Sequence, residues 1–261
     1  AGELSMWKAV SFPNAARNAI FSAKLASNGM TGPSPIFEGE MGFWKQVSGK
    51  FILNTNNFGS KSNKFLITKR ITKYYPAEIR SQSAITAAIT AGIKIHNISD
   101  IKKIEILTTE SGYKVLGKDK EKWSPKTKET ADHSLPFIVC SALLYKNINL
   151  ESYKESRLLD KKIISLLKLT SVKEQKELTE LYPKCIPNEV KITLKNNTVV
   201  DETVLYQKGH PKNPMNDYEL ENKFKLLASR NMSNKKINIL LKELRNFESI
   251  KNISRLFELT R

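Results

Sequence analysis

The chain has 261 residues, of which 40% are hydrophobic, and its 43 lysines and arginines against 26 acidic residues give a net charge of +17. This length suffices to bury a sizeable core in one large domain or two smaller ones. The longest uncharged apolar run, Leu135 to Tyr145, is too short to span a bilayer. No secretory signal precedes the first helical pattern, and Cys140 and Cys185 lie far apart. We therefore expect a cytoplasmic protein with reduced thiols and no membrane span.

The positive charge favours either a nucleic-acid partner or an anionic small substrate. Lysines dominate and mostly stand in mixed runs such as 118–122, which is typical of solvated surface. The chain carries no RNP-like aromatic stripe, zinc spacing or arginine-rich helix. We therefore expect no nucleic-acid binding.

The amino-terminal part predicts a helix followed by irregular structure. From Leu4 to Ala26 apolar residues recur at helical intervals in an alanine-rich stretch, which predicts a buried helix. Asn28-Gly29 is typical of a helix end, and 31–35 predicts turns. Glycines and aromatic residues alternate irregularly from Phe37 to Phe51, which favours packed structure without regular elements.

The middle of the chain mixes helix and strand patterns. Tyr74-Tyr75-Pro76 breaks the backbone. In chain order the patterns after it predict a helix from Ala77 to Ile95, a strand over 103–108, a surface loop over 117–129, a buried helix from Leu135 to Tyr145, further helices over 150–169, and a hairpin from Val190 to Val200 with a two-residue turn at Asn196-Asn197.

A further helix is predicted to begin at Asn216 or Asp217, and the chain is helical from there to its end. The expected fold class is therefore mixed. An α+β lid domain over 68–212 is inserted into a partial all-α helical domain that is built from both ends of the chain, 1–67 and 213–261.

Asp132-His133 is the most specific candidate for chemistry. A histidine beside a carboxylate can act as an oriented acid/base pair. A structural histidine explains the pattern equally well, because adjacent residues do not share a helix face. An N-cap for the following helix would also explain Asp132 or Ser134.

Several cations lie at the expected domain borders. Lys73 precedes the break before the lid domain, and His210 and Lys212 lie at its other end. If the two borders meet, these groups would converge on a polyanion. Lys8 and Arg17 are unusual charges in the first helix. A solvated lysine or a structural salt bridge is the alternative in each case.

The start of the second helix offers polar groups for carboxylates and hydroxyls. Glu78 and Gln82 are four residues apart, with Ser81 and Ser83 beside them. Helix capping is the ordinary alternative. The three histidines and two cysteines form no metal pattern, and there is no glycine-rich phosphate loop, so we expect neither a metal nor another cofactor.

Five separated segments, in the same order over most of the chain, resemble those of the MmgE/PrpD family. They are Leu4–Lys8 with Asn14–Asn18, Gly29–Pro33 with Phe37–Gly39, Lys73–Glu78 with Ser81–Ala84, Glu129–Pro136, and Gly209–Met215. The resemblance implies a large helical domain formed by both ends of a longer polypeptide, with a smaller α+β lid domain between them. It also implies a homodimer.

The resemblance implies a cofactor-independent hydro-lyase that dehydrates 2-methylcitrate or a close tricarboxylate between the two domains. It gives Lys8 and Lys73 as the cations, and His133, Ser81, Gln82, His210 and Lys212 as further residues of the cleft. Tyr113 corresponds to a family active-site tyrosine, although its loop aligns poorly. The decarboxylase branch of the family carries a histidine where this chain has Glu78, which favours a dehydratase.

The chain also departs from the family. It begins just ahead of the Lys8 motif, so the family's amino-terminal helical region, with its acidic and histidine residues, is expected to be absent. The chain is then partial, or a second chain supplies that region, or activity has been lost. The alternatives to a dehydratase are a decarboxylase or epimerase acting on a polycarboxylate, and a non-catalytic subunit.

Overall fold

The computed structural model describes residues 4–52, 54 and 65–260. Residues 55–64, which belong to the first expected helical segment, lie outside the described part. The fold is mixed α/β, with helices and one four-stranded mixed sheet. In chain order its main elements are α1 (Trp7–Ser27), α2 (Gln82–Ile93), β1 (Ile101–Thr108), α3 (Glu110–Gly112), α4 (Lys128–Ala131), α5 (Leu135–Tyr145), α6 (Glu155–Leu158), α7 (Lys161–Leu167), β2 (Thr170–Glu174), α8 (Lys176–Glu180), β3 (Asn188–Leu194), β4 (Val199–Val204), α9 (Asp217–Ala228), α10 (Asn234–Arg245) and α11 (Ser254–Leu259).

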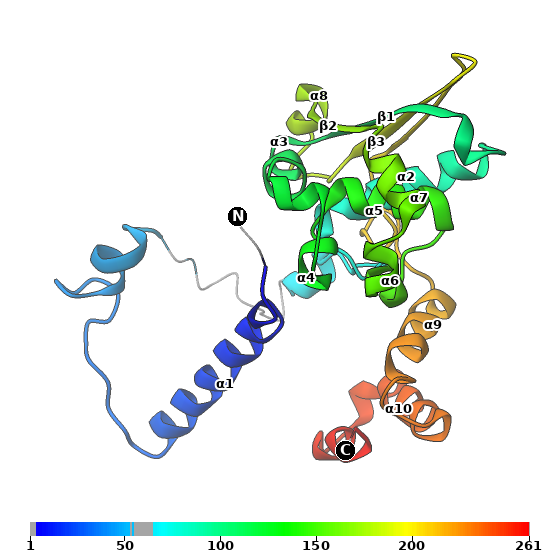
Figure 1. The fold of residues 1–261 in the computed structure, drawn as a ribbon. Helices are drawn as coiled ribbons and strands as arrows, with labels where there is room; N and C mark the ends of the chain where they lie inside the picture. The colour runs from blue at the N-terminus through cyan, green and yellow to red at the C-terminus, as the bar shows by residue number, and fades with distance from the viewer. Residues whose placement is uncertain (1–3, 53, 55–64, 261) are drawn as a thin grey trace.

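The sheet has the strand order β2-β1-β3-β4. Strand β1 pairs in parallel with β2 and antiparallel with β3, which in turn pairs antiparallel with β4. Helices α2 and α5 cover one face, and α7 packs against α5 (Figure 1). On β1 the charged Lys103 and Glu105 form an ion pair of 2.8 Å, and Glu105 also pairs with Lys173 of β2 at 3.4 Å. The apolar face of the sheet is therefore buried against helices, while charged residues occupy solvent-accessible positions.

Helix α5 is the centre of the core. The Ser134 hydroxyl caps it by accepting from the Phe137 amide at 3.2 Å, and Pro136 stands in its first turn, where no amide hydrogen is needed. The left-handed Lys146, with φ of 55°, ends it. Residues 135–143 are all buried. The predicted bounds and burial of this helix are confirmed.

Helix α1 is confirmed as a helix, but the prediction that it is buried is wrong. It ends as expected: Gly29 has φ of +88°, its amide donates to Ala26, and the Met30 amide donates to Leu25. No residue of α1 is buried, because no other element in the described part of the chain covers it. Figure 1 shows it running away from the body that contains the sheet.

The carboxyl-terminal helices follow the prediction closely. The Asn216 side chain accepts from the Glu219 amide at 2.9 Å, and the Glu219 carboxylate accepts from the Asn216 amide at 2.8 Å, which forms a capping box for α9. In α10 only Ile237 and Leu240 are buried. The division into domains at 68 and 212 stays a prediction.

Other local predictions need correction. The hairpin is confirmed, but Leu194 and Thr198 are paired, so its loop has three residues, of which Asn197 alone has a positive φ, 66°. The strand β2 was not expected. Part of the predicted surface loop is also buried: Lys122 lies in the 3₁₀ helix Lys120–Trp123 with 1% of its surface exposed. The charges around Lys122 predict a solvated loop, but the long aliphatic part of a lysine side chain can be buried.

Candidate active site

Three loops that carry the family-like segments meet near the amino end of α2. The Glu78 amide donates to the Asp132 carbonyl at 3.0 Å, and the Thr72 amide donates to the Gly209 carbonyl at 2.9 Å. Gly209 has φ of +88°, and a Cβ atom there would overlap the Thr72 carbonyl oxygen, so a glycine is required. Residues close to the two expected borders of the lid domain, Thr72 and Gly209, are therefore in direct contact.

Gln82 holds the first of these loops in place. Its Oε1 accepts from the amides of Tyr74 and Tyr75 at 3.1 and 3.0 Å, and its Nε2 donates to the carbonyls of Tyr75 and Ala77 at 3.0 and 3.2 Å. The side chain is fully buried. Its hydrogen-bonding capacity is therefore used by the backbone. A direct contact with substrate stays a prediction, and the structure gives Gln82 a positioning role.

Glu78 and Arg80 form a second fixed point beside this loop. Glu78 has extended backbone and caps the 3₁₀ helix Ile79–Ser81, so it does not share a helix face with Gln82 as expected. Its buried carboxylate pairs with the Arg80 guanidinium at 2.6 Å, and Arg80 Nε donates to Ser111 at 3.2 Å. The buried Ser81 hydroxyl donates to the Glu78 carbonyl at 2.7 Å. Ser81 is thus also occupied by backbone.

His133 differs from these residues because one of its ring nitrogens has no partner. The residue is buried, with 7% of its surface exposed, and Nδ1 contacts the Asp132 carboxylate. Nε2 is buried without a hydrogen-bond partner among the described residues. When Nδ1 donates its hydrogen to Asp132, the Nε2 lone pair remains available as a base. Asp132 therefore orients His133, and the cap of α5 is Ser134.

Tyr153 is a further candidate that the sequence did not reveal. Its hydroxyl is buried without a partner among the described residues. Burial, and then the charge of Asp132, raise the pKa of Tyr153 above its ordinary value, so the hydroxyl stays protonated. It lies in the 3₁₀ helix Leu150–Tyr153, where only a general helical pattern was visible. No spacing signal connects it with Asp132.

Lys73 is exposed, and a second cation lies beside it. The Lys223 ammonium of α9 donates to the Lys73 carbonyl. Burial, and then the charge of Lys73, lower the pKa of Lys223. A pocket of about 240 Å³ lies next to them, and it is lined by residues of the loop and of α9 that include Tyr74, Tyr218 and Lys223. The sequence placed Lys223 in a helix without a functional signal.

His210 and Lys212 form a separate cluster with Tyr206. His210 Nδ1 accepts from the Lys212 amide at 3.0 Å, and the Lys212 ammonium donates to the Tyr206 hydroxyl at 2.9 Å. The rings of His210 and Tyr206 lie 4.8 Å apart. Burial lowers the pKa of His210. The loop joins the site through Gly209, but the Lys212 charge is held by Tyr206.

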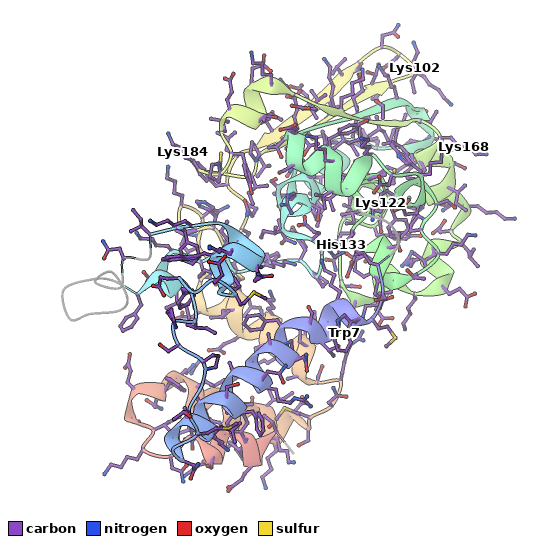
Figure 2. The ribbon with its side chains drawn as sticks, turned by 90° about the vertical axis from the view of Figure 1, so that its left-hand side faces the viewer. Trp7, Lys102, Lys122, His133, Lys168 and Lys184 are labelled. Carbon is purple, nitrogen blue, oxygen red and sulfur yellow. The ribbon has the colours of Figure 1, made fainter. Side chains whose placement is uncertain are left out.

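Lys8 and Tyr113 are not brought to the centre of this site. Lys8 is exposed on α1. Figure 2 shows its neighbour Trp7 at the end of α1 that lies nearest the body, on the side of His133. Tyr113 begins the π-helix Tyr113–Gly117, half-buried against the core, two residues after the Ser111 that binds Arg80.

Within residues 4–52, 54 and 65–260, no three histidine, cysteine, aspartate or glutamate side chains lie close enough to hold a metal ion. In the same described part, no helix is long and apolar enough to cross a membrane.

Comparison with known proteins connects these motifs with enzymes. Human cis-aconitate decarboxylase is 24% identical over 92% of this chain and 50% of its own length. The mitochondrial 2-methylcitrate dehydratase of Yarrowia lipolytica is 28% identical over 52% of this chain and 27% of its own length. The 2-methylcitrate dehydratase of Escherichia coli K12 is 26% identical over 60% of this chain and 34% of its own length. The chain thus spans half or less of the length of these relatives.

Family models agree with the segments that meet in space. The MmgE/PrpD C-terminal domain matches residues 75–246, which is most of the chain. The MmgE/PrpD N-terminal domain matches residues 1–56. The sequence resemblance is confirmed, and the chain belongs to the MmgE/PrpD family.

Proposed function

We propose that the protein acts as a cofactor-independent hydro-lyase that dehydrates 2-methylcitrate, or a close tricarboxylate, to the unsaturated acid. The observation that carries the proposal is the buried Asp132-His133 pair, with Nε2 unpartnered among the described residues, in loops that carry the family motifs. The similarity to 2-methylcitrate dehydratases supports the substrate class.

In the proposed reaction, His133 Nε2 takes a proton from the carbon beside a substrate carboxylate. The electron pair of that C–H bond forms the new double bond, and the C–O bond to the hydroxyl breaks. Tyr153 is the candidate that gives a proton to the departing hydroxyl, which leaves as water. The charge of Asp132 stabilises the imidazolium that His133 becomes.

Cations around the loops supply the other requirement, which is to hold carboxylates and to stabilise negative charge in the transition state. Lys73 and Lys223 lie beside the same loop and pocket. Lys212 lies on the loop that pairs with Thr72, and the neighbouring His210, whose pKa is lowered by burial, belongs to this loop as a neutral ring. Lys8 joins the site in this proposal only if α1 packs against the body. The walls of the proposed cleft include Ser81, Gln82 and Tyr113.

Decarboxylation of cis-aconitate is the second candidate, and the match to the human decarboxylase over 92% of the chain favours it. Glu78 argues for dehydration. In the family resemblance, the decarboxylase branch has a histidine at the position where this chain has Glu78. Here the Glu78 carboxylate pairs with Arg80. Two further alternatives within the family are an epimerase activity and a role as a non-catalytic subunit.

The exposed α1 bears on the assembly. Trp7, Phe12 and Phe21 are exposed on it, and such apolar surface is normally covered. We propose that a second copy in a homodimer, or a chain that supplies an amino-terminal helical region, covers this helix. The cytoplasmic location stays a prediction.

A substrate panel tests the proposed function. Protein purified with any chains that accompany it would be incubated with 2-methylcitrate, citrate and cis-aconitate in the presence of a metal chelator. We expect an unsaturated product from 2-methylcitrate, detected by ultraviolet absorbance, without release of carbon dioxide. Carbon dioxide from cis-aconitate would identify the decarboxylase instead. Absence of turnover with all three acids would contradict both enzyme proposals.

A further inference from the structure

A second pocket lies at the end of the sheet opposite the candidate active site. Its volume is about 800 Å³, within the range of ligand pockets, roughly 300–1,000 Å³. Ile101, the first residue of β1, lines this pocket. Thr108 is the last residue of the strand, and the nearby Ser111 accepts a hydrogen bond from Arg80 of the candidate active site. Seven steps of about 3.3 Å along the strand separate the two ends by about 23 Å. The pocket is therefore distinct from the His133 site.

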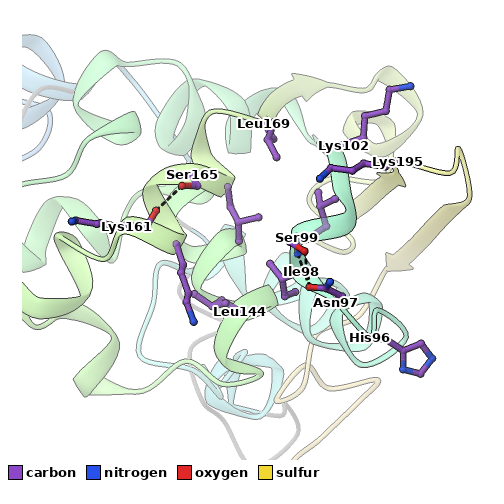
Figure 3. Close-up of a pocket in the computed structure, with 13 residues that line it drawn as sticks. His96, Asn97, Ile98, Ser99, Lys102, Leu144, Lys161, Ser165, Leu169 and Lys195 are labelled. Carbon is purple, nitrogen blue, oxygen red and sulfur yellow. Dashed lines mark hydrogen bonds between the residues drawn. The ribbon is translucent and has the colours of Figure 1, made fainter.

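The floor of the pocket is aliphatic. It is formed by side chains from four elements: Ile98 of the 3₁₀ helix Ile98–Asp100, Ile101 of β1, Leu144 of α5, Leu166 of α7, and Leu169 just after α7. Figure 3 shows Ile98, Leu144 and Leu169 around the same space. Leu169 is 38% exposed, so burial of this surface by a ligand removes apolar area from water.

The rim of the pocket is positively charged. Lysines 102, 161, 162 and 195 line it together with His96, and no acidic residue is among the lining residues. In Figure 3 the Lys195 side chain reaches toward the aliphatic residues, whereas Lys102 and Lys161 extend outward. The Lys102 ammonium is held by the Asn197 side chain at 3.0 Å. Lys161, Lys162 and Lys195 have no acidic partner among the described residues.

We propose that this pocket binds an amphipathic organic anion, an aliphatic chain that ends in a carboxylate. The floor would take the chain, and Lys195 would face the carboxylate, with Lys161 and Lys162 adding positive potential from α7. Charge complementarity selects this ligand, because a neutral chain would leave the lysines unused and a cationic one would be repelled. The proposal does not depend on the catalytic function.

Three probes with one chain length separate charge from hydrophobicity. Decanoate, decanol and decyltrimethylammonium would be titrated into the full chain by isothermal calorimetry. We expect decanoate to bind at least tenfold more tightly than the cation and several-fold more tightly than decanol. Across octanoate and decanoate, Kd should fall about two- to fourfold for each methylene. Equal binding of all three probes would overturn the proposal.

Variants locate the binding. Lys195→Glu should weaken decanoate about three- to fivefold, and the double variant Lys162→Glu with Lys195→Glu roughly tenfold or more, as expected for part-exposed charge pairs. Leu169→Ala should weaken decanoate and decanol alike. Lys176→Glu on α8 makes the same charge change away from the pocket and should have little effect.

The exposed apolar side chains of α1 need their own control, because they also can bind an aliphatic chain. Phe21→Ser should leave decanoate binding unchanged. If Phe21→Ser weakens it while Lys195→Glu and Leu169→Ala do not, the proposed pocket is not the site. Circular dichroism of each variant checks that the fold is retained.

Discussion

The body around the sheet and the helices at the two ends of the chain show that apolar composition and burial are separate properties. Every residue of the continuous hydrophobic core lies between Ala77 and Ile192. Helix α1 is longer than α5 and contains Val10, Ile20 and Phe21, yet none of its residues is buried. Helix α5 is buried because a sheet and two helices surround it. A helix gains hydrophobic stabilisation only from a partner that covers it.

The largest expected difference between the two regions comes from phenylalanine truncation. Phe137→Ala in α5, where 1% of the side chain is exposed, should lower the free energy of unfolding by about 3–5 kcal/mol. Phe21→Ala in α1, where 62% is exposed, should change it by about 0.5 kcal/mol or less. Urea unfolding of the two variants measures both. Equal losses would show that α1 is covered in solution.

Gln82→Met should have the second-largest effect. The change leaves the partly buried amides of Tyr74 and Tyr75 without their acceptor, which should cost about 1–3 kcal/mol. The matched change Gln46→Met in the exposed amino-terminal part should cost less than about 0.5 kcal/mol. Unfolding curves give the comparison. If Gln82→Met unfolds like wild type, the loop is held by something other than this side chain.

The helix caps give a smaller contrast. Ser134→Ala removes the cap of α5 and should lower the free energy of unfolding of the body by about 1–2 kcal/mol. Asn216→Ala likewise removes a side chain that accepts from a backbone amide in the first turn of α9. It should lower helical content at the carboxyl end and leave the transition of the body unchanged. Far-ultraviolet circular dichroism measures the helical content, and near-ultraviolet circular dichroism follows the unfolding transition of the body. A shift of the body transition by Asn216→Ala would show that α9 unfolds with it.

The smallest expected effect is a pH dependence from His210. Burial holds its pKa below the usual 6.5, so the unfolded chain binds a proton more readily than the folded one. The contribution to stability is complete above pH 6.5 and is lost as the pH falls from there toward the lower pKa of the folded state. His210→Gln should remove this part of the acid destabilisation in thermal melts between pH 7 and pH 5. An unchanged acid profile would contradict the assignment.

The sequence predicted well those elements whose stability is local. The α5 segment is predictable because its cap, proline and apolar run agree, and the hairpin because Asn197 tolerates a positive φ. The exposure of α1 cannot be predicted from its sequence, because periodicity indicates a helix and not what surrounds it. Strand β2 is short, and its lysine and glutamate hide an alternating pattern.

The candidate site was only partly predictable for the same reason. The sequence identified Lys73, His133 and His210 as separate motifs, and the structure shows that their loops are linked through Gly209 and Glu78. Tyr153 and Lys223 lie near these loops only because of tertiary packing, and their spacing in the sequence does not predict that packing. Gln82 and Ser81 were expected to contact substrate, and their polar groups are bonded to backbone.

Turnover of the His133→Gln variant tests the central claim most directly. If His133 is the base oriented by Asp132, His133→Gln should lower kcat for 2-methylcitrate at least about a hundredfold, with the free energy of unfolding changed by about 1 kcal/mol or less. Asp201→Asn on the exposed strand β4 is the control and should keep full turnover. A His133→Gln variant that turns over like wild type, or that loses activity only because it unfolds, would contradict the account.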